Sequence, residues 1–232
     1  MLKICFEVWK IDYEKIFESM LPQLTEECRA KTEQNELEKL IDRLGEDTVP
    51  LMKKLIGFLD TDTRDQIIVW LIESQRDTLV STANKALHDL LGGESVVIGD
   101  LYAQDEPGTR ISLHASQVKI DTKQLAESPA LTGITGGLAK LILKLSDPET
   151  IEKEGIKLLS SEYVKPKIIS ALTDGLSEAG LHITFLDLKI MEDSGEEKVP
   201  RMMDPEKDEG LLPDAIEDKI IDALVAWLKE IL

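Results

Sequence analysis

The 232-residue chain is poor in cysteine and in basic residues. Its two cysteines, Cys5 and Cys28, lack metal-like spacing, so neither a disulfide framework nor a zinc module is indicated. Lysine and arginine number 27 against 45 acidic residues, which leaves a net charge of −18. Such a surface would repel a phosphate backbone or an anionic bilayer. We therefore expect no nucleic acid and no membrane among the partners.

Long apolar runs are missing as well. Residues 67–72 (IIVWLI) form one of the longest, whereas a membrane-spanning helix needs roughly 20 apolar residues. Near the N-terminus, Glu7 interrupts the chain before an apolar stretch typical of a secretion signal develops. These absences, with the low cysteine content, predict a reduced, cytoplasmic setting.

What the chain does contain is enough apolar sequence for a core. The composition of 42% apolar and 31% charged residues is typical of a folded globular protein that needs no metal or disulfide. Leu2, Ile4, Phe6 and Val8 stand at alternate positions, which predicts a half-buried strand over residues 2–9.

Two later regions also predict strands. Residues 95–103 and 110–120 have the pattern of a β-hairpin, and a change of apolar face within the second strand predicts a bulge near Ser116 or Gln117. Residues 181–191 are rich in branched and aromatic side chains, which predicts a further strand. This strand ends in LKI, an echo of the VKI that ends the hairpin, and we expect the two strands to be neighbours in the sheet.

The longest helical pattern covers residues 64–91. Its apolar positions form one stripe, and Thr63 with Gln66 three residues later predicts a capping box at its start. The preceding FLDTDT at residues 58–63 resembles the aspartate motif of haloacid-dehalogenase-type phosphatases, which would imply a nucleophilic carboxylate. Helical spacing of the apolar residues before it instead favours a turn between two helices.

We predict an α+β fold, mostly helical, with a small, mainly antiparallel sheet of about four strands packed on amphipathic helices. Pro148 predicts the first turn of one further helix, and residues 163–179 predict another. Residues 1–192 form the predicted α+β domain. Residues 193–213 are acidic and rich in turn-forming residues, which predicts a flexible linker. Residues 214–232 then predict a C-terminal amphipathic helix.

That C-terminal helix carries more apolar side chains than water tolerates, so it must dock on a protein surface. Its own body is one such surface, and a second subunit or a separate partner is another. The residues predicted to make this interaction are Ile216, Ile220, Leu224, Trp227, Leu228 and Ile231.

A glycine-rich segment, LTGITGGLAK at residues 131–140, precedes a predicted helix. Such a turn can aim backbone N–H groups at a phosphate or carboxylate, although it can also simply let the backbone bend. It lacks the GK[ST] of a P-loop. The candidate ligand-binding residues are Thr132, Gly133, Thr135, Gly136, Gly137 and Lys140.

The three histidines are His88, His114 and His182. His88-Asp89 is similar to the paired ligands of HD-type phosphohydrolases, but that arrangement requires another histidine upstream and the sequence has none. His114 and His182 lie on the two strands expected to be neighbours, so they could hold a metal with nearby carboxylates. The alternative is that both are ordinary residues of a sheet.

No spacing in the sequence predicts a catalytic set, and none indicates a particular cofactor. We interpret the chain as a non-enzymatic, cytoplasmic interaction or scaffold protein that forms a homo-oligomer through helical faces or binds another protein. The alternative is an enzyme or sensor that binds a small phosphorylated ligand at the glycine-rich turn, residues 133–140.

Overall fold

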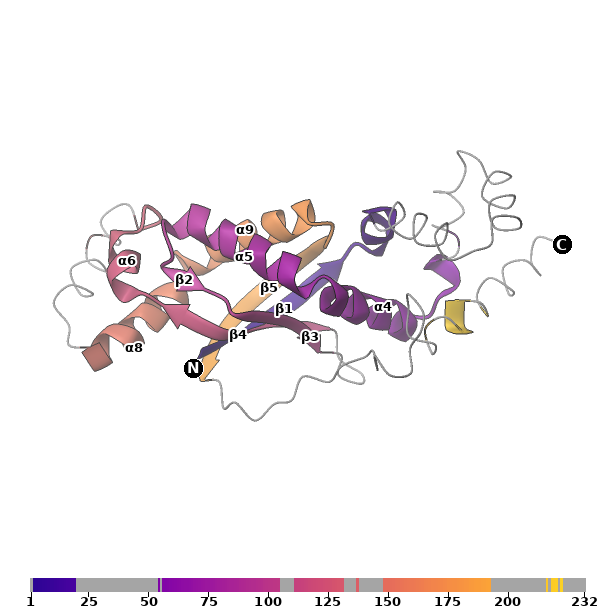
Figure 1. Cartoon of the computed structure of the whole chain (residues 1–232), viewed down its shortest axis with the longest axis horizontal. Helices are drawn as coiled ribbons and strands as arrows, with labels where there is room; N and C mark the ends of the chain where they lie inside the picture. The colour runs from indigo at the N-terminus through magenta and orange to yellow at the C-terminus, as the bar shows by residue number, and fades with distance from the viewer. Residues whose placement is uncertain are drawn as a thin grey trace. The chain divides into compact units, whose positions relative to one another are not determined.

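The computed structural model describes residues 2–19, 54, 56–104, 111–131, 137, 148–192, 216, 218–220 and 222. These residues contain helices and one antiparallel sheet of five strands, which confirms the predicted α+β fold (Figure 1). The chain divides into two compact units, one of residues 1–11 and 72–200 and one of residues 12–71 and 201–232.

The sheet belongs to the first unit and has β1 in its interior. On one side β1 pairs with β5, and on the other it pairs with β4, whose far side carries β2 and β3 in succession. The strands are β1 (Leu2–Ile11), β2 (Val96–Val97), β3 (Asp100–Gln104), β4 (Ser112–Ile120) and β5 (Ile183–Glu192).

The predicted pairing of the strands that end at residues 118–120 and 188–190 is wrong, because β1 separates β4 from β5. Val118 pairs with Leu2 of β1 but residues 119–120 pair with β2, whereas residues 188–190 pair with residues 4–6 of β1. The similar sequences therefore reflect a similar alternation of buried and exposed positions, and a local pattern carries no information about which strand lies between.

Two helices cover the apolar face of this sheet. Helix α5 (Arg76–Leu91) contacts β2 and β3, helix α9 (Lys165–Glu178) contacts β5, and the helices contact each other (Figure 1). The alternating residues predicted for the first strand are all buried, and the ring of Phe6 lies 5.2 Å from that of Phe185. Each helix contributes one buried stripe: Leu79, Ala83, Leu87 and Leu91 from α5, and Ile168, Leu172 and Leu176 from α9.

The predicted bulge in β4 is confirmed. Leu2 lies opposite Val118 but Ile4 lies opposite Ala115, so β4 contains one extra residue there. Gln117 takes up the change with a left-handed φ of 52°. Gly99 faces it so closely that a Cβ would lie 2.7 Å from the Cβ of Gln117, so a side chain at this position would force the backbone to shift.

The predicted helix over residues 64–91 is two helices, α4 (Thr61–Ser74) and α5, because Gln75 leaves the helical conformation with φ −106° and ψ 17°. The predicted stripe residues of α4, Ile67, Ile68, Leu71 and Ile72, are buried, and so are Val69 and Trp70 between them. Residues 67–72 of α4 are therefore covered on every side, whereas the amphipathic α5 needs only one covered face.

The start of α4 also differs from the prediction. The carboxylate of Asp60, rather than the hydroxyl of Thr63, caps the helix by accepting the Thr63 N–H at 2.7 Å. The backbone N–H and hydroxyl of Thr63 stabilise the ionised carboxylate, which lowers the pKa of Asp60. Within FLDTDT, residues 59 and 60 form the turn between helical residues 56–58 and α4, and such an interhelical turn is what the helical spacing predicted.

Two further helices of the first unit have described bounds, α6 (Thr122–Glu127) and α8 (Pro148–Leu159), and they contact each other. Helix α8 begins at the predicted proline, and α9 is followed by Gly180, whose φ is 87°. The boundaries predicted at residues 192 and 213 stay a prediction, because residues 193–215 lie outside the described part of the chain. Among the described helices, none is long and apolar enough to span a membrane.

The second unit contains a short helix at residues 13–19 and most of α4. The Tyr13 hydroxyl donates a hydrogen bond to the carboxylate of Asp65, and the Arg64 guanidinium lies 5.8 Å from the centre of the Tyr13 ring. These contacts join the helix at residues 13–19 to the start of α4.

Candidate functional site

Two β-bulges occur at one place in the pairing of β1 with β5. From Glu7 to Val8, β1 advances by one residue while β5 advances by two, from Asp187 to Phe185. Leu186 is therefore an extra residue on β5. One step later the bulge is on the other strand, because Val8 lies opposite Phe185 and Lys10 lies opposite Thr184. Trp9 is the extra residue on β1, and the two bulges cancel.

Both extra residues are large, apolar and exposed. Trp9 is 57% exposed and Leu186 is 52% exposed, which makes them the two most exposed large apolar side chains of the described residues. A bulge re-aims a side chain that a regular strand would direct elsewhere. The bulge on β5 brings Leu186 to the face on which Trp9 already stands by the regular alternation of β1, and we name Trp9 and Leu186 the bulge surface.

The charged residues next to the bulge surface carry both signs. Glu7 and Lys10 flank it on β1, and Asp187 and Lys189 flank it on β5. The Lys165 ammonium donates a hydrogen bond to the Asp187 carboxylate at 2.5 Å and thereby lowers the pKa of Asp187. Acidic and basic groups are thus balanced here, although the chain as a whole carries a charge of −18.

The sequence contained a signal for half of this surface. In the strand over residues 2–9, Lys3, Cys5 and Glu7 occupy the positions opposite the apolar row, and Trp9 continues that polar row. A large aromatic residue on the polar side of a half-buried strand is unexpected unless it contacts something. Leu186 gave no such signal, since its exposure depends on the bulge.

The predicted metal pair is not brought together. His114 lies opposite Cys5 of β1. His182 directly precedes Ile183, which lies opposite Ile11, so the two histidines are at least six residue steps apart along β1. At about 3.3 Å per residue this is roughly 20 Å. Within the described ranges, no three or more His, Cys, Asp or Glu side chains are grouped so that they could hold a metal ion.

His114 is instead packed within the sheet, with 7% of its surface exposed. Its ring stacks on that of Tyr102 at 5.2 Å, and its Nε2 lies 2.7 Å from the Ser112 hydroxyl and 3.9 Å from the Cys5 thiol. Because the hydroxyl makes the shorter contact with Nε2, the imidazole is engaged by Ser112 rather than poised as a base for the thiol.

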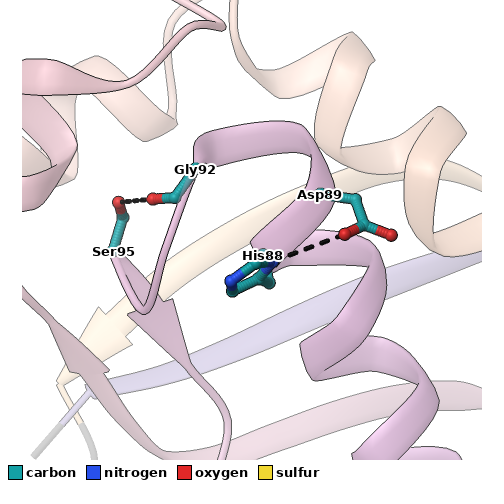
Figure 2. A network of polar contacts seen from close by, with 4 residues as sticks. All are labelled: His88, Asp89, Gly92 and Ser95. Atoms are coloured by element: carbon teal, nitrogen blue, oxygen red, sulfur yellow. Dashed lines mark hydrogen bonds and ion pairs between the residues drawn. The ribbon is translucent and has the colours of Figure 1, made fainter.

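His88 and Asp89 lie at the end of α5, where Figure 2 shows their contact beside the turn that follows the helix. The His88 Nδ1 is 3.4 Å from the Asp89 carboxylate, and both side chains are mostly exposed. Gly92, with φ 79°, ends the helix by donating its N–H to the His88 carbonyl, and Ser95 donates its hydroxyl to the Gly92 carbonyl at 2.8 Å. This network terminates a helix and encloses no binding site.

A shallow groove of about 400 Å³ runs between α5 and α9. Its charged lining residues are Lys85, Asp89, Asp174 and Glu178. Three carboxylates against one ammonium would repel a phosphate, so this groove does not suit the predicted phosphorylated ligand.

Most of the predicted ligand-binding turn lies outside the described residues. Only Gly137 is described, as an exposed helical residue with nothing within 4 Å of where a Cβ would stand. The other candidate residues, Thr132, Gly133, Thr135, Gly136 and Lys140, lie outside the described residues, and their role stays a prediction.

The C-terminal segment is described at five positions, which include two of the predicted interaction residues. Ile216 is 1% exposed and Ile220 is half-buried, and Lys219 donates a hydrogen bond to Gln66 of α4 at 3.1 Å. This part of the segment therefore packs on its own chain. The other four predicted interaction residues, Leu224, Trp227, Leu228 and Ile231, lie outside the described residues.

Comparison with protein families, with curated proteins and with solved structures finds no match to this chain.

Proposed function

We propose that the protein is a non-enzymatic interaction protein that associates with a second copy of itself through the bulge surface. The observation that carries this proposal is that two large, exposed apolar side chains, Trp9 and Leu186, stand at opposed bulges of two paired strands. Large apolar side chains that are grouped on an exposed surface are typical of docking surfaces. Tryptophan is among the residues that contribute most to the binding free energy of interfaces.

The local charges favour a second copy as the partner. Two chains of charge −18 repel each other over most of their surface. Beside the bulge surface the acidic and basic groups are balanced, so the repulsion between two copies is weaker there. Across a two-fold axis, an acidic side chain of one copy can then meet a basic side chain of the other. An isologous contact of this kind uses the same patch twice.

The expected dimer is weak. Burying one side chain of this size contributes about 2 kcal/mol, and a two-fold contact would bury four of them. The loss of translational and rotational freedom opposes association by an amount of the same order. Added salt should strengthen the dimer, because it screens the repulsion between the two acidic chains.

The association through helical faces that the sequence predicts, its phosphorylated-ligand alternative and the cytoplasmic setting all remain predictions. The described part of the C-terminal segment supports only contacts within the chain, since Ile216 is already covered. For that reason the bulge surface, and not the C-terminal helix, is the surface we propose for self-association.

Sedimentation velocity from about 1 µM to about 1 mM, the range in which weak dimers form, tests the proposal. We expect the mass of the wild-type protein to rise with concentration and that of the Trp9→Ser/Leu186→Ser variant to stay monomeric. Met191→Ser is the matched control, because Met191 is 43% exposed on the same strand at a regularly paired position. It should behave as the wild type.

A wild-type protein that stays monomeric over the whole range, at low and at high salt, would refute self-association. Equal association of the wild type and the double variant would refute the bulge surface as its site. Thermal unfolding of each variant is needed alongside, so that a loss of association is not confused with a loss of the fold.

A further inference from the structure

The two edges of the sheet share one local arrangement. On β5, the carboxylate of Asp187 accepts the backbone N–H of Leu188 at 2.8 Å. On β3, at the opposite edge, the carboxylate of Asp100 accepts the backbone N–H of Leu101 at 2.9 Å. In both strands an Asp-Leu pair thus turns a carboxylate back onto the strand's own backbone.

A basic residue approaches each carboxylate, and in both cases it is the first residue of a covering helix. Lys165 begins α9, and its ammonium lies 2.5 Å from the Asp187 carboxylate. Arg76 begins α5, and its guanidinium lies 3.6 Å from the Asp100 carboxylate. The same three parts, an aspartate, the next amide and a helix-initial base, therefore occur at both edges although the segments are unrelated in sequence.

Sheet edges are the place where such an arrangement matters. A strand at an edge presents backbone N–H and C=O groups that another strand can pair with, and proteins block this with charges placed on the edge. At either edge an incoming strand would meet a carboxylate that is already bonded to the edge strand's own backbone. That strand would also have to desolvate the carboxylate and its basic partner, which is unfavourable.

We propose that Asp100 and Asp187 are edge guards, which stop a second copy of this chain from adding a strand to the sheet at β3 or at β5. Within the described residues no strand pairs with the outer side of either β3 or β5, so both edges have a reason to be guarded. The role of the guards differs from that of the bulge surface. The guards prevent backbone pairing between copies, whereas the bulge surface joins copies through side-chain contacts.

The test uses the Trp9→Ser/Leu186→Ser background, so that association through the bulge surface cannot contribute. In that background we expect Asp187→Ala to raise the mass measured by sedimentation to twice the monomer mass or more. Lys165→Ala is the matched control. It breaks the same ion pair but leaves the carboxylate on the Leu188 amide, so it should stay monomeric.

A second change should reverse the effect. Thr184 is exposed on β5, and Thr184→Lys places a new charge on the same edge. Added to Asp187→Ala, it should restore the monomer. Backbone hydrogen exchange of the associated Asp187→Ala protein should show slower exchange along β5 than in the monomer, as strand pairing requires.

The proposal is overturned if Asp187→Ala stays monomeric at the concentrations used, or if Lys165→Ala associates to the same degree. The second result would assign any association to loss of the ion pair. If Asp187→Ala does not fold, Asp187→Asn takes its place, since it keeps an oxygen for the Leu188 amide and removes only the charge. That variant should associate, though less than the alanine variant, and a purely monomeric Asp187→Asn would equally reject the guard.

Discussion

The two edges of the sheet differ in length and in how closely they are guarded. The β5 edge is a single strand of ten residues, and its aspartate meets a lysine at 2.5 Å. The opposite edge consists of a two-residue and a five-residue strand, and its aspartate lies 3.6 Å from an arginine. A short, interrupted edge is a poor template for another strand, whereas a long one needs a charge. The shorter ion pair is therefore on the longer edge, which is the better template for an added strand.

The edges also differ in what fixes them to the body. The β2–β3 edge is attached by Asn84 of α5, whose side-chain amide donates to the Ile98 carbonyl at 2.9 Å and accepts the Ile98 N–H at 2.8 Å. The β5 edge is instead fixed along its whole length by pairing with β1 and by packing of α9. Breaking one attachment at a time should therefore affect the two edges unequally.

The largest effect is expected for Asn84→Ala. Ile98 is buried, so removing the amide leaves its N–H and C=O without their partner in an apolar setting, which should lower the free energy of unfolding by about 2–3 kcal/mol. Urea denaturation measures the loss. Ser81→Ala, an exposed position on the same helix, serves as the control and should change little. A loss below about 0.5 kcal/mol for Asn84→Ala would show that this attachment is unimportant.

A smaller effect is expected for Gly99→Ala, which tests the close approach of the interrupted edge to the β4 bulge. The new Cβ would meet that of Gln117 at 2.7 Å, so β4 or the β2–β3 connection must shift, and the expected loss is about 1–2 kcal/mol. Gly57→Ala is the matched control, because nothing lies within 4 Å of its Cβ position in a helical segment. It should leave stability unchanged or raise it slightly. Equal effects of the two substitutions would contradict the close approach.

The smallest effect is expected when the charge of either guard, Asp187 or Asp100, is removed. At concentrations that keep the protein monomeric, Asp187→Asn should lower the free energy of unfolding by about 0.5 kcal/mol, as is usual for a partly exposed ion pair. Asp100→Asn should lower it by less, because its basic partner is more distant. Chemical denaturation of the wild type and both variants provides the values, and a larger loss for Asp100→Asn would reverse the ranking.

The pH dependence of that smallest effect has a definite sign. The folded-state pKa of Asp187 is lowered by Lys165, below the unfolded value of about 3.9. Its contribution is therefore fully present above that unfolded value and is lost as the pH falls through the folded-state pKa. The difference between wild type and Asp187→Asn should stay constant from pH 7 to about pH 5 and shrink below about pH 4. A difference that grows in acid would exclude this origin.

The sequence predicted the elements whose causes are local. The alternation of residues 2–9, the proline that begins α8 and the glycine that follows α9 each determine a backbone conformation within a few residues. The bulge at Gln117 was also predictable, because the apolar face changes within one strand. The class of fold follows from these elements.

Strand order and the candidate site were not predictable in the same way. The place of β1 between β4 and β5 depends on contacts between segments more than 100 residues apart, and similar triplets at two strand ends gave a wrong neighbour. Leu186 is exposed only because a bulge shifts the register, and the guards depend on which strands lie at the edges. Trp9 and the two Asp-Leu pairs were visible in the sequence, but their meaning required the topology.

The interior position of β1 has a consequence for synthesis on the ribosome. β1 leaves the exit tunnel before its partners, yet β4 begins only at Ser112 and β5 only at Ile183. At about 5–20 residues per second, the nascent chain waits roughly 10–35 s before β1 can have both neighbours. Until β4 has emerged, the apolar row of Leu2, Ile4, Phe6 and Val8 has no strand of this sheet to join, so chaperones that hold nascent chains should bind this protein at β1.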